Sequence, residues 1–169
     1  AEAAPVSPLV VLLDLGKRAR AAGSAEELAF LAVTDTQRLV PYRQAALWLE
    51  GRGIAALSGV VQPESDAPYA QWLNKVGRAL SAKNATAPFR VTAAELPPAL
   101  AAEWKAWLPA EAAWVPLPGS ERSGPGGLLL AGDVHFGDDA LTLLEEWMHA
   151  WQHAWRALDR PARWLGARG

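Results

Sequence analysis

Three residues near the end of the chain have the types and spacing of metal ligands. Glu145, His149 and His153 lie four residues apart, so a helix places all three on one face. Imidazole and carboxylate groups bind zinc, but no second carboxylate or histidine with matching spacing lies nearby. This face also lies away from the apolar stripe of the same segment, which is typical of a solvated helix surface. We therefore predict no metal site.

The signatures of catalysis each lack a defining residue. The glycine-rich loop 119–127 joins two predicted strands and has no Gly-Lys-Ser/Thr ending for phosphate binding. Neither Ser58-Gly59 nor Ser123-Gly124 has the flanking glycines of a nucleophile elbow. The chain has no cysteine, which excludes a thiol nucleophile, a thiolate metal centre and a disulfide. We predict no catalytic residue and expect the protein not to be an enzyme.

Tryptophan is the residue that the chain uses most unusually, with nine among 169 residues. Six aromatic residues on four predicted elements are candidates for lining a small-molecule cavity: Trp48, Tyr69, Trp72, Trp104, Trp107 and Trp114. Aromatic rings also fill such a space as ordinary core, which is the favoured interpretation, and the ligand cavity stays open as an alternative. A second set, Trp147, Trp151 and Trp155, covers more of the last helix than one buried stripe needs. This set predicts a dimerisation or docking seam.

Length and charge limit the class of protein. A chain of 169 residues fits one domain, and a net charge of −2 disfavours a nucleic-acid partner. The longest uncharged apolar stretch near the start, Pro8 to Leu13, ends at Asp14 and is too short to span a bilayer. The sequence begins with Ala1 rather than methionine, so we expect an excised fragment or a processed chain.

Apolar periodicity, capping residues and glycine turns predict the elements that would position these residues. Ser24 and Glu27 form a capping box ahead of a helix that Pro41 would end, and Thr92 to Glu95 repeats the capping pattern. Asp138 or Asp139 is expected to cap the last helix. The predicted helices are 9–22, 25–39, 69–80, 96–108 and 138–158, and the predicted strands are 44–50, 54–61, 89–91, 112–118 and 126–132.

Several motifs in this order resemble a known family. They are Tyr42-Arg43-Gln44-Ala45-Ala46-Leu47-Trp48, Trp114-Val115-Pro116-Leu117, Gly127-Leu128-Leu129-Leu130 and the segment from Phe136 to Glu145. Over most of residues 9–159 the chain resembles a GAF domain. The resemblance implies an α+β fold with a five- or six-stranded antiparallel sheet, terminal helices on one face and shorter helices on the other. Bilin-binding GAF domains use a cysteine that this chain lacks, and the acids of cyclic-nucleotide sites are replaced by Ala93-Ala94. We predict no cofactor.

The tryptophan-rich last helix and its basic exit are similar to the GAF-like region of HlyD-type membrane fusion proteins. Four arginines and one acid lie between Arg156 and Gly169, which is typical of a cytoplasmic approach to a membrane, although a solvated terminus has the same composition. The resemblance implies a non-catalytic interaction module at the cytoplasmic face of the inner membrane, with secretion or efflux components as partners and homodimerisation through the terminal helices. A ligand sensor is the alternative. We expect a flexible segment at 1–8, the GAF-like domain at 9–159 and a basic, juxtamembrane tail at 160–169.

Overall fold

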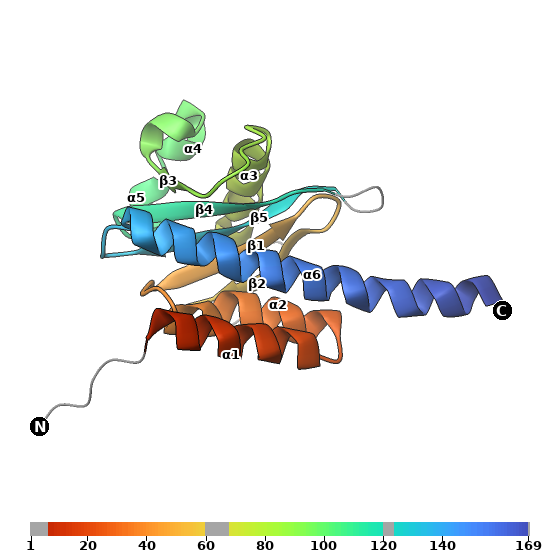
Figure 1. Cartoon of the computed structure of the whole chain (residues 1–169). Coiled ribbons are helices and arrows are strands. Elements are labelled where there is room, and N and C mark those ends of the chain that lie inside the picture. The colour runs from red at the N-terminus through yellow and green to blue at the C-terminus, as the bar shows by residue number, and fades with distance from the viewer. Residues whose placement is uncertain (1–6, 60–67, 120–123, 169) are drawn as a thin grey trace, which may run out of the picture.

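The computed structural model describes residues 7–59, 68–119 and 124–168, with side chains described as far as Leu158. Over these residues the chain forms one five-stranded antiparallel sheet in the order β2-β1-β5-β4-β3. Helices cover both faces of the sheet (Figure 1). The expected α+β architecture is confirmed, and the number of strands is settled at five within the described part of the chain.

The central strands carry apolar side chains on both faces because each face packs against helices. The strands are β1 (Gln44–Leu49), β2 (Gly53–Ser58), β3 (Phe89–Val91), β4 (Glu111–Leu117) and β5 (Gly126–Gly132). Leu47 and Val115 lie opposite Leu128 and join one hydrophobic core, whereas Trp48, Trp114 and Leu129 join the other. The β1–β2 turn includes Gly51 at a φ of 86°, a conformation that favours glycine. Residues 60 and 61 of the second predicted strand lie outside the described residues.

One face carries the first two helices and the last, α1 (Pro8–Ala21), α2 (Ala25–Thr34) and α6 (Asp138–Arg168), as Figure 1 shows. Ser24 caps α2 by accepting from the Glu27 amide at 3.1 Å, as the sequence predicts. The predicted extension of this helix to Leu39 is wrong. The chain tightens after Thr34 into a 3-10 turn, η1 (Asp35–Arg38), in which the buried Thr36 hydroxyl donates to the Ala32 carbonyl at 2.7 Å.

The last helix differs from its predicted form at both ends. Asp138 and Asp139 lie in its first turn, where carboxylates interact favourably with the helix dipole, so neither precedes the helix. The helix continues past Leu158 to Arg168, although this stretch contains the poor helix formers Pro161 and Gly166. In Figure 1 this second half of α6 runs beyond the body of the domain. No helix in the described part of the chain has the length and apolarity that a membrane span requires.

The opposite face carries α3 (Pro68–Ser81) and a group of short turns, η2 (Ala93–Glu95), α4 (Pro98–Ala101) and α5 (Trp104–Trp107). The sequence predicts a single proline-interrupted helix over 96–108, whereas the structure has two short helices, 98–101 and 104–107, in this stretch. Thr92 makes no side-chain cap, and the Glu103 amide donates to the Leu100 carbonyl three residues back, which tightens the chain between the two short helices. These short elements place Trp104 and Trp107 against the sheet.

Candidate functional site

Four of the six aromatic candidates for a ligand cavity are buried between the sheet and the short helices. Trp48, Trp72, Trp104 and Trp114 are each less than 10% exposed and share one hydrophobic core. The indole nitrogen of Trp48 donates to Asn74 Oδ1 at 2.7 Å, and that of Trp104 donates to the Pro109 carbonyl at 2.7 Å. The Trp72 indole donates to the Leu100 carbonyl at 3.0 Å. These polar atoms are therefore satisfied inside the protein.

Glycines on two elements show how tightly these rings fill their space. A Cβ at Gly77 of α3 would lie 2.5 Å from Cγ of Trp48, and one at Gly127 of β5 would overlap the Trp114 ring. Such spacing leaves no room for a methyl group at Gly77 or Gly127. The four buried tryptophans therefore pack closely on this side, while Trp114 also borders a pocket of about 280 Å³ beside Leu80 and Pro116. A ligand role for the six aromatic residues stays a prediction.

Tyr69 and Trp107 lie half-buried at the end of the sheet where β1 begins. Their ring centroids are 5.5 Å apart. The Gln44 side-chain amide donates to Tyr69 Oη at 3.0 Å and to the Trp107 carbonyl at 3.1 Å, which fixes the pair against the sheet. Trp107 borders an open groove of about 590 Å³, whose walls are Gln37, Tyr42, Arg43, Gln44, Gly59, Lys105, Ala106, Trp107, Leu108 and Pro109.

Sequence reasoning missed this groove. Arg43, Gln37 and Lys105 come from separate elements and form no motif, so no pattern along the chain indicates that they meet. Trp107 is one of the residues that the sequence predicts to line a ligand cavity. It lies at the edge of the sheet rather than in the core, because the other tryptophans fill the core. The signal that could have pointed to the groove is the pair Arg43-Gln44 at the start of a strand that is otherwise apolar.

The two tyrosines are expected to resist ionisation in the folded protein. Burial raises the pKa of Tyr69 from 10.0 to about 12, against a smaller lowering effect of the Gln44 hydrogen bond, and burial raises the pKa of Tyr42 further. Because the folded state favours the neutral phenols, their contribution to stability is complete below pH 10 and is lost as the pH rises through the folded pKa values.

Ultraviolet absorbance of phenolate checks this expectation, since the chain has two tyrosines. In the folded protein we expect little phenolate at pH 10, with ionisation only as the pH approaches the Tyr69 pKa of about 12. In urea, which unfolds the chain, both tyrosines should ionise near pH 10. Ionisation of one tyrosine near pH 10 in the folded protein would contradict the burial of that ring.

The three tryptophans of the predicted docking seam, Trp147, Trp151 and Trp155, differ in burial. Trp147 and Trp151 are at most 1% exposed and belong to the core beneath α6, where their indole nitrogens donate to Thr36 Oγ1 and to the Leu28 carbonyl, both at 2.7 Å. Trp155 is half-buried and stacks on Trp151 with centroids 5.1 Å apart. The Arg52 guanidinium lies 5.8 Å from the centroid of the Trp155 ring, so the β1–β2 turn reaches this part of α6. Two of the three rings therefore pack inside the core of this chain.

The buried bond between Trp147 and Thr36 gives a test of that core. Thr36→Val keeps the shape of the side chain but leaves the indole N–H without its acceptor, so we expect the free energy of unfolding to fall by about 1–3 kcal/mol in urea denaturation. Thr36→Ser retains the hydroxyl and is the matched control. If Thr36→Val costs no more than Thr36→Ser, the hydrogen bond contributes no more to stability than the methyl group does.

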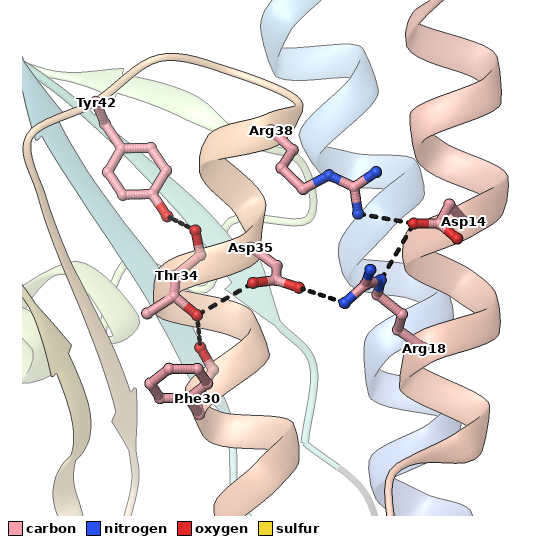
Figure 2. Close-up of polar contacts among 7 residues, drawn as sticks. All are labelled: Asp14, Arg18, Phe30, Thr34, Asp35, Arg38 and Tyr42. Atoms are coloured by element: carbon pink, nitrogen blue, oxygen red, sulfur yellow. Dashed lines mark hydrogen bonds and ion pairs between the residues drawn. The ribbon is translucent and has the colours of Figure 1, made fainter.

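A network of ion pairs joins α1 to the end of α2 (Figure 2). Asp14 Oδ2 lies 2.7 Å from Arg38 Nη1 and 3.1 Å from Arg18 Nε, and Arg18 also lies 3.7 Å from Asp35. The hydrogen bonds from Arg38 and then Arg18 lower the pKa of Asp14 below its usual value. Near it, the Tyr42 hydroxyl donates to the Val33 carbonyl at 2.6 Å. These ion pairs link α1 to the 3-10 turn that follows α2.

The candidate metal ligands lie on the outward side of α6, with His149 and His153 exposed and Glu145 half-buried. Residues 7–59, 68–119 and 124–158 contain no group of three or more side chains arranged to hold a metal ion.

Comparison with known proteins identifies the fold. No protein-family model and no curated protein matches this sequence. The GAF domain of a protein described as a sensor histidine kinase from Pseudomonas syringae pv. tomato superposes with a TM-score of 0.62 at 17% identity, covering 96% of this chain and 93% of that one. The phycoerythrobilin-bound GAF domain of a cyanobacterial phytochrome gives a TM-score of 0.62 at 12% identity, covering 94% and 100%.

A third solved structure is similar over a comparable length. It is the N-acylhomoserine lactone dependent LuxR-family transcription factor CepR2 from Burkholderia cenocepacia, with a TM-score of 0.55 at 17% identity, covering 91% of this chain and 96% of that one. Identities this low carry information on the fold alone. The sheet order, the two helical layers and these likenesses together show that this chain has a GAF-like fold.

Proposed function

We propose that this chain is a non-catalytic regulatory module that acts by docking to other proteins through its face of α1, α2 and α6. The observation that carries this proposal is the set of exposed apolar side chains on two helices of this face, which are Leu9, Val10 and Leu13 of α1 and Phe30 of α2. On that face Leu9 and Leu13 of α1 are 65% and 71% exposed, one helical turn apart. Neighbouring exposed leucines of this kind favour a protein contact.

We further propose that the module is the cytoplasmic, GAF-like part of a HlyD-type membrane fusion protein in a secretion or efflux system. The support is the last helix, whose 31 residues span about 46 Å at 1.5 Å per residue and run beyond the body of the domain (Figure 1). Its outer half carries Arg160, Arg163 and Arg168 against the single acid Asp159. A basic helix end suits the cytoplasmic side of an inner membrane. Homodimerisation through the same helices is part of this proposal.

Site-specific photo-crosslinking in the full-length protein, inside the cells that make it, tests the docking surface. A crosslinking residue at position 13 is expected to give discrete adducts with a second copy or with secretion or efflux components. The same residue at Val134, which is 57% exposed and precedes α6, is the control and should give none. An unmodified protein at position 13 would contradict the docking surface.

Cell fractionation tests the membrane assignment separately. The full-length protein is expected in the inner-membrane fraction, with this domain digested by protease added from the cytoplasmic side. Recovery in the soluble fraction would overturn the HlyD-type assignment and leave the docking proposal standing.

Sedimentation of the purified chain gives its oligomeric state, which tests homodimerisation. Leu13→Glu should convert a dimer to a monomer without a change in Tm.

A second candidate function is sensing of a small organic ligand. The observation that favours it is the groove beside Trp107, which is of a size typical of ligand sites. Two of the similar structures are described as a phycoerythrobilin-bound domain and as a protein dependent on an N-acylhomoserine lactone, which adds support from the fold. The charges and rings on the groove walls narrow the class of ligand that such a sensor would bind.

A further inference from the structure

The groove beside Trp107 carries positive charge without negative charge. Arg43 enters from the segment before β1 and Lys105 from α5, and no aspartate or glutamate is among the residues that form its walls. Arg43 meets Asp133 through Nη1, at 3.1 Å and 3.3 Å from the two carboxylate oxygens. Lys105 makes no ion pair with any residue that the structure describes. Among the described residues Lys105 is therefore without a counterion, and Arg43 has guanidinium nitrogens that Asp133 does not contact.

The carboxylates nearest in the sequence are engaged elsewhere. Glu103 Oε1 accepts from the Trp107 indole nitrogen at 3.4 Å, and Glu111 Oε1 lies 3.0 Å from Nδ1 of His135. Neither belongs to the walls of the groove. The positive charge of Lys105 is thus available to an external anion, because none of the described residues places an acid on the walls of the groove.

Trp107, Leu108 and Pro109 add an apolar wall to a groove whose lining is otherwise mainly polar. The Trp107 ring is tilted by 37° against the ring of Tyr69. Since Gln44 holds both Tyr69 and the Trp107 backbone, this wall is fixed before any ligand arrives. A rigid aromatic surface reduces the ordering cost of binding a planar molecule.

We propose that this groove binds a small organic anion. Its carboxylate or phosphate group pairs with Lys105 and with the guanidinium nitrogens of Arg43 that Asp133 does not use, and its flat apolar body lies on Trp107. A volume of about 590 Å³ lies within the range of ligand sites of this kind. The site deepens the sensing alternative and is independent of the docking surface on α1.

Nuclear magnetic resonance on the 15N-labelled chain tests this site with four probes at constant ionic strength. Benzoate and phenyl phosphate supply the two anionic groups on a ring, benzamide supplies the ring without charge, and inorganic phosphate supplies charge without a ring. We expect both ring anions to bind at about millimolar concentration, as suits ligands of so few atoms, and to shift the Trp107 indole and Gln44 amide signals. Benzamide and inorganic phosphate should each bind about tenfold more weakly. The stronger of the two ring anions identifies the preferred acidic group.

Matched variants assign the binding to the groove. Lys105→Gln is expected to weaken benzoate and phenyl phosphate about tenfold while leaving benzamide unchanged, because it removes the charge alone. Lys17→Gln removes an exposed lysine from α1 and should have no effect. Equal binding of benzamide, signals that shift away from the groove, an unaffected Lys105→Gln variant or no binding of either ring anion would each overturn the proposal. None of these outcomes alters the crosslinking expected at position 13. The anion site and the docking surface are therefore tested independently.

Discussion

Replacing Trp114 by alanine is expected to lower the free energy of unfolding by about 3–5 kcal/mol, because one of the largest fully buried side chains is lost. Trp114 is 1% exposed, lies opposite Phe89 and Leu129 in the sheet and packs against the backbone of Gly127. Its removal leaves a void that these three neighbours cannot fill, because all of them belong to the adjacent strands β3 and β5. Chemical denaturation measures the loss.

The same variant converts a filled interior into a cavity, which gives a second measurement. Indole at about 1 mM should stabilise Trp114→Ala by on the order of 1 kcal/mol and leave the natural protein unchanged, because a ligand stabilises only the form with room for it. Trp155→Ala, at a half-buried ring on α6, is the control that should not respond to indole. An equal response of the natural protein would mean that its interior already holds an open cavity, which would favour the sensing function.

Gly77→Ala is expected to destabilise the protein by about 1–3 kcal/mol, although alanine is the better helix former. The new methyl group would lie 2.5 Å from Cγ and 2.6 Å from Cδ1 of Trp48. That ring cannot move aside without losing its 2.7 Å hydrogen bond to Asn74 and its place in the sheet. Thermal unfolding measures the effect as a lowered Tm.

Gly16→Ala is the matched control, since Gly16 is also a buried glycine inside a helix. Its new methyl group would meet the far end of the Arg20 side chain at 3.3 Å, and that flexible group can turn away. We expect a gain of about 0.5–1 kcal/mol from helix propensity. If both substitutions change stability in the same direction, contact with Trp48 does not determine the effect at Gly77.

Local features of the sequence predicted most of the elements correctly. The Ser24 cap, the glycine turn after Leu49 and the paired apolar runs at 112–118 and 126–132 appear in the structure with small shifts at their ends. Each depends on residues within a few positions of one another, where backbone preferences and hydrogen bonds act directly. One error occurred where a longer-range partner intervened, at Thr36, whose hydroxyl lies between the Ala32 carbonyl and the Trp147 indole.

The sequence by itself determined the α+β class, the order of the elements and the excess of tryptophan, because periodicity and composition follow from neighbouring residues. The tertiary structure alone decided what the aromatic rings do: Trp48 and Trp114 fill the sheet interior, Trp147 and Trp151 bond across to α2 and the turn after it, and Trp107 borders an open groove. Periodicity can place a ring on the inner side of its element. Whether that ring fills the core or borders a groove depends on glycines, carbonyl groups and cationic side chains from distant parts of the chain. These groups come together only when the sheet and both helical layers have packed.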